Sequence, residues 1–167
     1  MTKVLRGVAM SVLEYNELTM DHFQNPRNVG VVKNGNGYGK IGEPGCGDIC
    51  EITLCVENDI IEDIKFRVYG CAGAIATSSV VTEMAKGKSI DYALQLTDDD
   101  VVEYLGGLPE GKKHCSLLAV QALHQAIYDY LLNKRLEKEG KVNTRSHFDR
   151  LADETLQEIL QRAKQNK

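Results

Sequence analysis

The chain has 167 residues, of which 43% are hydrophobic and 26% charged, and its formal net charge is −4 at pH 7. This length and apolar content suffice for one domain with its own core plus an appendage. A net negative charge does not favour binding to nucleic acid, so we do not expect a nucleic-acid partner. No apolar run approaches the roughly 20 residues that span a bilayer, so we do not expect a membrane protein.

The first eleven residues carry two positive charges but no long apolar core and no cleavage pattern for secretion. We therefore expect a cytoplasmic protein. The five cysteines are an odd number and do not resemble a secreted disulfide framework. In a reducing compartment such thiols bind metal, carry sulfur or fill the core.

The first predicted element is an amphipathic helix from Val12 to Phe23. Proline and glycine in residues 25–30 end this helix. A polar, glycine-rich loop at residues 34–39 then leads to a short strand near Lys40 and Ile41. The N-terminal part is thus expected to supply one helix and the first strand of a sheet.

A second glycine-rich turn, residues 42–48, places a thiol and a carboxylate two residues apart, at Cys46 and Asp48. At this spacing in an extended chain, both side chains leave the backbone on the same side and can face one object. The glycines allow close approach of the backbone, and Pro44 fixes one φ angle. The turn therefore predicts part of a binding site. The alternative for Asp48 is a turn cap through its own backbone.

Two longer strands follow this turn. From Ile49 to Glu57 the even positions are apolar, which indicates a buried face and makes Cys50 a small core side chain. Cys55 falls on the more polar face without a ligand-like neighbour. A tight turn at residues 58–59 leads to a second alternating segment, Ile60 to Tyr69. Its apolar face is expected to consist of Ile60, Glu62, Ile64, Phe66 and Val68. Together the strands predict a three-stranded antiparallel meander with one buried face.

After Gly70 the sequence period changes from two to 3.6, which predicts helices. They are expected at Cys71–Lys86, Ser89–Leu96, Asp98–Leu105 and Lys112–Leu132. Gly87 ends the first helix, and Ser89 and Thr97 are N-cap candidates for the two short ones. Strands first and helices after, without alternation, indicate an α+β fold.

Two further cysteines lie near the starts of predicted helices. Cys71 opens the first helix, and Cys115 follows His114 near the start of the long one. A helix N-terminus favours a thiolate, and Lys112 and Lys113 add positive charge beside Cys115. Cys115 is therefore a candidate nucleophile as well as a ligand. Three segments that each present a soft ligand at the end of a regular element indicate a metal or cluster site.

Thiolates are the preferred ligands of iron–sulfur clusters and also of zinc, and the sequence alone does not separate the two metals. With Asp48 and His114, the sequence offers five donors. A tetrahedral zinc ion, or a cluster with two irons, has four ligand positions for the protein, so one donor is spare. A spare donor permits the ligand exchange that a carrier needs. Helix capping or packing is the alternative for His114. The other histidines, His22, His124 and His147, have no partner in the sequence pattern and are interpreted as surface or interface side chains.

The segment Lys134–Lys167 differs in composition from the rest. It carries nine basic and six acidic side chains, a net +3, so the remaining 133 residues carry −7. Apolar side chains recur on it at helical spacing, namely Phe148, Leu151, Ala152, Leu156, Ile159, Leu160 and Ala163. We expect a terminal helix packed on the domain, with a partner-binding or self-associating helix, and hence a homo-oligomer, as the alternative. The expected division is a domain at 1–133 and a charged helical extension at 134–167.

Several short motifs occur in one order along residues 12–130. They are Asn-Pro-Arg-Asn-Val-Gly at 25–30, Cys-Gly-Asp at 46–48, Tyr-Gly-Cys-Ala-Gly-Ala-Ile-Ala at 69–76, Gly-Lys-Ser at 87–89 and Lys-His-Cys-Ser at 113–116. In this order and at these spacings, the set resembles the iron–sulfur cluster assembly scaffolds of the IscU/NifU N-domain family. Any one motif alone would be weak, whereas the set is specific.

The resemblance implies an IscU/SufE-like fold, a three-stranded antiparallel sheet with helices packed on it, and a C-terminal helical extension beyond it. It implies that the site residues are Cys46, Asp48, Cys71, His114 and Cys115. The implied activity is that of a carrier rather than an enzyme, which builds a labile, transient [2Fe–2S] cluster and hands it to apo iron–sulfur proteins. Fe²⁺ is the metal of that activity, and Zn²⁺ is an alternative occupant of the isolated protein.

Sulfur would come from a pyridoxal-phosphate cysteine desulfurase of the IscS/NifS type, with Cys115 as the persulfide acceptor. Many IscU proteins carry Leu-Pro-Pro-Val-Lys before the His-Cys pair, which a dedicated Hsp70-type chaperone grips. Here residues 108–112 read Leu-Pro-Glu-Gly-Lys, which favours a NifU-like or chaperone-independent system. The rival functions are a zinc-dependent sulfurtransferase like the SufU branch, which lacks the equivalent of His114, and a zinc-stabilised interaction module.

Overall fold

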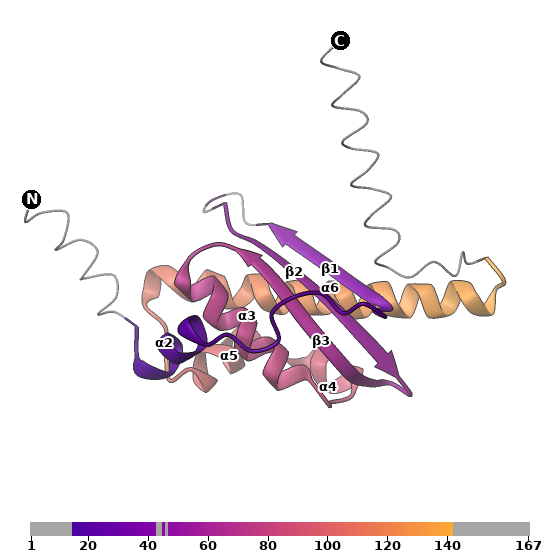
Figure 1. Ribbon diagram of the computed structural model, residues 1–167, viewed down its shortest axis with the longest axis horizontal. Coiled ribbons are helices and arrows are strands. Elements are labelled where there is room, and N and C mark those ends of the chain that lie inside the picture. The colour runs from indigo at the N-terminus through magenta and orange to yellow at the C-terminus, as the bar shows by residue number, and fades with distance from the viewer. Residues whose placement is uncertain (1–14, 43–44, 46, 142–167) are drawn as a thin grey trace, which may run out of the picture.

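The computed structural model describes residues 15–42, 45 and 47–141 (Figure 1). In chain order the elements are α2 (Glu17–Gln24), β1 (Gly37–Gly42), β2 (Ile49–Glu57), β3 (Ile60–Tyr69), α3 (Ala72–Ala85), α4 (Ile90–Gln95), α5 (Asp98–Tyr104), the 3₁₀ turn η1 (Glu110–Lys112) and α6 (Lys113–Lys138). The strands form one antiparallel sheet in the order β1-β2-β3, which confirms the expected α+β fold. The first helix begins at Glu17, later than the predicted Val12, because the Asn16 side chain caps it by accepting from the Thr19 amide. Residues 12–14 and the segment from residue 142 onward lie outside the described residues.

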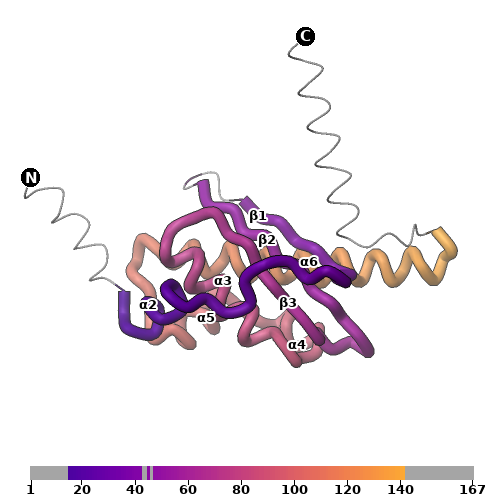
Figure 2. The backbone as a smooth tube through the Cα atoms, viewed as in Figure 1, coloured from indigo at the N-terminus to yellow at the C-terminus, as the bar shows by residue number. Residues whose placement is uncertain are grey.

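One face of the sheet is buried under α3 and α6, which lie behind it in Figure 2. The apolar even positions of β2 form the middle of the core, as predicted; they are Cys50, Ile52, Leu54 and Val56. No described helix is both long enough and apolar enough to cross a membrane.

The buried face of β3 differs from the prediction in its first half. Ile61 is fully buried, whereas Ile60 is half-buried and Glu62 is exposed. The register explains the difference, because Val56 pairs with Ile61 while Cys55 pairs with Asp63. Glu62 is therefore an extra residue in the ladder, and such a bulge changes which side of the strand faces the core.

The edge strand β1 lies very close to α6. A Cβ atom at Gly39 would overlap the backbone of Ala122 and Ala126, and one at Gly37 would overlap the carbonyl oxygen of Ala126. Because only hydrogen occupies these positions, the helix packs directly against the strand backbone. This contact fixes how the first turn of α6 sits relative to the sheet.

Helix α6 ends six residues later than predicted, at Lys138 rather than Leu132. No helix-breaking residue occurs before Gly140, which has φ +67°. The amide of Gly140 donates to the Glu137 carbonyl oxygen, and that of Lys141 donates to the Leu136 carbonyl oxygen. These two bonds form a Schellman cap, which ends the helix and turns the chain away from its axis.

Helix α2 is fixed to α3 by a buried polar contact. His22 is 1% exposed, and its Nδ1 lies 2.8 Å from the Ser79 hydroxyl oxygen, which also accepts from the Arg27 amide. His22 was interpreted as a surface or interface side chain without a partner; it is instead buried between α2 and α3 with Ser79 as its partner, which an amphipathic pattern cannot show. Burial lowers the pKa of His22.

The predicted caps of the short helices are confirmed. The Ser89 side chain accepts from the Tyr92 amide at the start of α4. Thr97 and Asp100 form a reciprocal capping box at the start of α5. The loop that follows α5 leads through η1 into α6, and it thereby carries the chain back to the end of the sheet where α3 begins.

Candidate metal and cluster site

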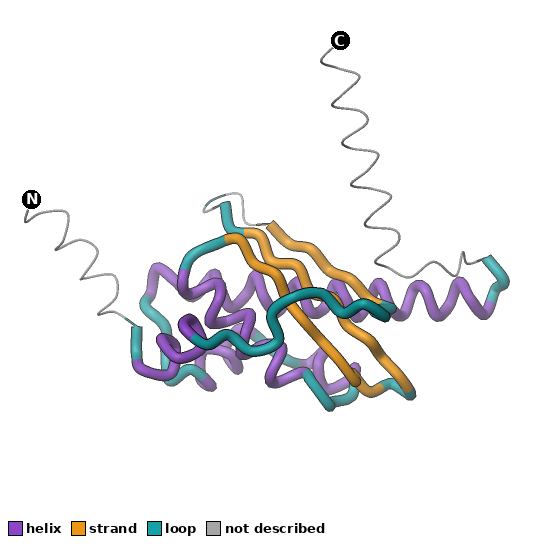
Figure 3. The backbone as a smooth tube through the Cα atoms, viewed as in Figure 1, coloured by secondary structure: helices purple, strands orange, loops and turns teal. Residues whose placement is uncertain are grey.

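Three segments far apart in the sequence meet at one end of the sheet. The loop before β2 and the loop after β3 lie side by side there, because Ile49 pairs with Tyr69 (Figure 3). Asp48 immediately precedes β2, and Cys71 is the N-cap residue of α3. Cys115 is the third residue of α6. The end of the sheet and two helix N-termini therefore share this corner.

The donor atoms of these segments are in contact. The Cys71 Sγ lies 3.5 Å from the Cys115 Sγ and 3.5 Å from an Asp48 carboxylate oxygen. The His114 Nε2 lies 3.7 Å from the Cys115 Sγ. One ligand atom each from Asp48, His114 and Cys115 can be chosen so that all three lie within 4.8 Å of one another. Four of the five predicted donors thus converge.

The fifth predicted donor, Cys46, lies outside the described residues. Its neighbour Gly47 has φ +75°, in the left-handed region that favours glycine. The backbone between Cys46 and Asp48 is therefore not extended at Gly47. The expected placement of the Cys46 and Asp48 side chains on one side, which required an extended chain, is therefore not supported.

The two thiols at the corner differ in exposure and acidity. Cys115 is fully buried, while Cys71 is half-buried. The hydrogen bond between them lowers the pKa of Cys71 to about 6, and the same bond together with burial raises the pKa of Cys115. Cys71 is thus the more acidic thiol, although the sequence pointed to Cys115.

The lysines near Cys115 act less strongly on the thiols than expected. The Lys113 Nζ lies 2.9 Å from a carboxylate oxygen of Glu110, and this bond raises the pKa of Lys113. Its charge is therefore compensated on the surface. The charge of Lys112 does lower the pKa of both thiols, although it is a smaller cause than their mutual hydrogen bond.

Two glycines and a tyrosine shape the corner, and none of the three was identified from the sequence as part of it. A Cβ at Gly70 would lie 2.7 Å from the Asp48 carboxylate carbon. A Cβ at Gly73 would lie 3.0 Å from the Tyr15 hydroxyl, 3.5 Å from the Cys115 Sγ and 3.7 Å from the Cys71 Sγ. Glycine at both positions leaves room for the donors. Tyr15 was simply part of a predicted helix, and no local pattern links it to the thiols.

The other two cysteines lie on β2, Cys50 near the start of the strand and Cys55 near its end. Cys50 is fully buried, and burial raises its pKa to about 11. Cys55 is half-buried, and burial likewise raises its pKa. Cys50 packs in the core and lies 3.5 Å from the Ser78 hydroxyl oxygen, which confirms the core position that the strand pattern predicted.

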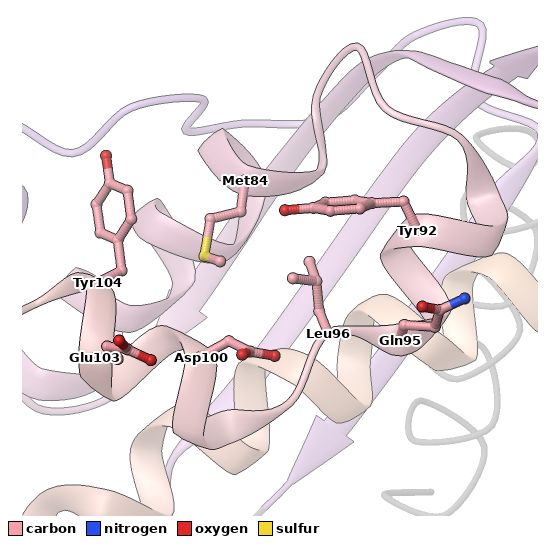
Figure 4. A pocket seen from close by; sticks show the side chains of 7 residues that line it. All are labelled: Met84, Tyr92, Gln95, Leu96, Asp100, Glu103 and Tyr104. Atoms are coloured by element: carbon pink, nitrogen blue, oxygen red, sulfur yellow. The ribbon is translucent and has the colours of Figure 1, made fainter.

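A separate surface groove lies between α3, α4 and α5 (Figure 4). Tyr92 and Tyr104 stand on either side of Met84, and the carboxylates of Asp100 and Glu103 lie along one edge. The methionine thioether is the only sulfur in its lining. This groove therefore does not offer the thiolates that a soft metal prefers.

The donor set at the corner suits a soft or borderline metal. Thiolate, imidazole and carboxylate together bind zinc in tetrahedral geometry, and thiolates hold iron–sulfur clusters. The carboxylate of Asp48 is a hard donor among soft ones, so it is the donor that exchanges most readily. The arrangement can hold such a centre and also release it.

Comparisons with known proteins agree with these features. The model of the family described as "NifU-like N terminal domain" matches residues 14–138. The chain is 54% identical over 132 residues to the iron–sulfur cluster assembly scaffold protein IscU of Aquifex aeolicus, covering 77% of this chain and 84% of that protein. It is 54% identical over 129 residues to the scaffold protein IscU 1 of Archaeoglobus fulgidus, covering 77% and 81%.

Among solved structures, the chain is similar to the N-terminal part of a nitrogen-fixing NifU-like protein from Brucella abortus. The TM-score is 0.58 at 20% identity, and the match covers 71% of this chain and 95% of that one. At this identity the likeness concerns the fold.

Proposed function

The chain belongs to the family of the NifU-like N-terminal domain, and from this premise we propose that it is a scaffold on which iron–sulfur clusters are assembled and from which they are passed on. The observation that carries the proposal is the contact of Cys71, Cys115 and Asp48 at one corner, with His114 beside them. The protein acts as a carrier rather than a catalyst, and the cluster is its cargo.

In this proposal a transient [2Fe–2S] cluster is held by the thiolates of Cys46, Cys71 and Cys115. Asp48 and His114 compete for the remaining position. Five donors for four positions allow one ligand to leave while another arrives, which is a condition for release. Because ligands must be deprotonated, Fe²⁺ binding displaces the proton that the two contacting thiols now share.

Sulfur enters, we propose, as a persulfide on Cys115, delivered by a cysteine desulfurase of the IscS/NifS type. The Cys115 thiolate attacks the outer sulfur of the desulfurase persulfide, and the desulfurase cysteine leaves as a thiolate. The acceptor gains one sulfur atom and the donor loses one, so the exchange balances. Apo iron–sulfur proteins are the proposed recipients of the finished cluster.

Delivery by a dedicated Hsp70-type chaperone is not part of the proposal. The second proline and the valine of the gripped motif are absent from residues 108–112. In addition, Leu108 is only 9% exposed, and residues 110–112 form the turn η1. A packed leucine followed by a 3₁₀ turn does not present a free extended peptide.

The proposal is tested by anaerobic reconstitution of the full chain with Fe²⁺, cysteine and a desulfurase. The expected result is a stoichiometric brown protein with visible cluster absorption, which then transfers its cluster to an apo-ferredoxin. The same reaction in the presence of equimolar Zn²⁺ distinguishes the scaffold function from the rival zinc-dependent function. A colourless zinc protein that still accepts sulfur from the desulfurase would replace the scaffold with a zinc-dependent sulfurtransferase.

A further inference from the structure

The outward side of α6 carries a row of exposed apolar side chains. The members are Leu117, Tyr128, Leu131 and Leu132, which are 43%, 60%, 36% and 55% exposed. Positions 117 and 128 are three helical turns apart, and 131 and 132 lie on the next turn, so the four share one side of the helix. We call this row the outer face of α6. The opposite side of the helix packs on the sheet.

A second apolar row of the same length follows in the sequence. Between residues 148 and 163, seven apolar side chains recur at helical spacing, from Phe148 to Ala163. This row and the outer face of α6 each span 16 residues, or about 24 Å of helix. The two rows match in length and in chemical character.

The end of α6 turns the chain away from the helix axis. The Schellman cap at Gly140 turns the backbone after Lys138, and Lys141 is the last described residue. Six residues, 142–147, then separate Lys141 from Phe148. Counted from the end of α6 at Lys138, the whole connection is nine residues, 139–147, which is about one more than the two to eight usual between antiparallel helices. A short linker also gives the two rows a high effective concentration, which favours pairing within one chain.

Charges favour the antiparallel orientation. The groove beside the C-terminal half of α6 is lined by Lys134, Arg135 and Lys138 and also by Asp59 and Glu139. Asp59 pairs with Lys134 and Glu139 with Arg135, so the positive charge of this half is partly compensated. The stretch 149–158, which would meet this half, has four acidic side chains and one basic one. The stretch 162–167, which carries three basic side chains, would reach the start of α6. Glu110 lies there, and Asp99 is near enough to act on Lys113.

From these observations we infer that residues 148–163 dock antiparallel on the outer face of α6 of the same chain as an amphipathic helix. Phe148 then lies near Leu132, and Ala163 lies near Leu117. The extension becomes the second half of a helical hairpin and covers the exposed apolar row. Its C-terminal end arrives two residues along α6 from Cys115.

Amide hydrogen exchange of the full chain, followed by mass spectrometry at two protein concentrations, tests the inference. Peptides from 148–163 should exchange at least about tenfold more slowly than an unstructured chain. The double variant Tyr128→Arg, Leu132→Arg should remove that protection and leave β2 unchanged. Both side chains are more than half exposed, so the domain should still fold.

The matched control is the double variant Tyr92→Arg, Tyr104→Arg, which alters the groove of Figure 4 and should leave the protection intact. Protection lost in the control but not in the α6 variant would place the segment in that groove and overturn the inference. Protection that falls on dilution would assign the contact to a second copy and would also overturn it. If residues 148–163 of the unmodified chain exchange as fast as an unstructured chain, the inference is also overturned.

Discussion

Asp48 is the donor with the least affinity for a soft metal at the corner, yet it is only 6% exposed and touches the Cys71 thiol. A carboxylate is a hard ligand, so it binds an iron–sulfur centre less firmly than a thiolate does and exchanges more readily. Its charge also attracts water and protons. We therefore propose that Asp48 shortens the lifetime of a bound cluster.

We predict that Asp48→Ala lengthens the lifetime of the bound cluster. The methyl group dries the corner and lets His114 take the free position. A lifetime on the order of fivefold longer corresponds to about 1 kcal/mol in the barrier to release. The measurement is the decay of visible absorbance under chelator, with cluster transfer to an apo-ferredoxin measured in parallel.

Asp48→Asn is the matched variant, since it keeps the size of the side chain and removes the charge. It should lie between wild type and Asp48→Ala in cluster lifetime. A cluster that decays faster than wild type in Asp48→Ala would show that the carboxylate anchors the cluster, and the labile-ligand account would then fail.

Cys115 is predicted to carry the persulfide. It lies in the first turn of α6, and its sulfur is buried against Cys71. After mixing with desulfurase and cysteine, mass spectrometry of peptides should show an added sulfur atom on Cys115. Cys115→Ser should lose that signal, and Cys50→Ser should keep it. Added sulfur found only on Cys71 would mean that the more exposed and more acidic thiol is the acceptor.

At the scale of elements, the contact between β1 and α6 holds the first turn of α6 in register with the sheet. We predict that Gly39→Ala lowers the free energy of unfolding by about 2 kcal/mol or more, because the new Cβ meets helix backbone that cannot move aside. Gly111→Ala is the control, since its Cβ would meet open space. Urea unfolding measures both. Equal stability of the two variants would contradict the account of this contact.

The sequence predicted most elements because their signals are local. The alternation in β2, the caps at Ser89 and Thr97, and the change of period after Gly70 all depend on near neighbours. The bulge that exposes Glu62 was missed, because the register of β3 against β2 is a property of the pair. Similarly, no sequence pattern shows that His22 is buried against Ser79.

The sequence predicted which residues meet at the corner, but not their relative acidity or their other neighbours. Asp48, Cys71, His114 and Cys115 were named from their motifs, and the structure brings them together. Their relative acidity could not be predicted, because it depends on a hydrogen bond between two distant segments. Tyr15 was missed for the same reason, since its hydroxyl lies beside Gly73, on a segment distant in the sequence.

At the scale of the whole molecule, the C-terminal extension and the site are separable. We predict that a chain ending at Lys141 still holds a cluster, because the removed segment contains no cysteine and a single histidine, His147. The cut follows Lys141 so that α6 keeps its cap. The shortened protein should self-associate more, since its outer face of α6 is left bare. Cluster content per chain and light scattering measure the two effects. A folded, shortened chain that holds no cluster would show that the extension shapes the site.

We propose that the thiols of Cys46, Cys71 and Cys115 together hold a transferable cluster. The most direct measurement is anaerobic reconstitution of five single serine variants beside wild type, with folding checked by circular dichroism. Cys46→Ser, Cys71→Ser and Cys115→Ser should each lose most of the visible cluster band, whereas Cys50→Ser and Cys55→Ser should keep it. A folded Cys50→Ser or Cys55→Ser protein without a cluster, or a full band in any of the first three, would contradict the account.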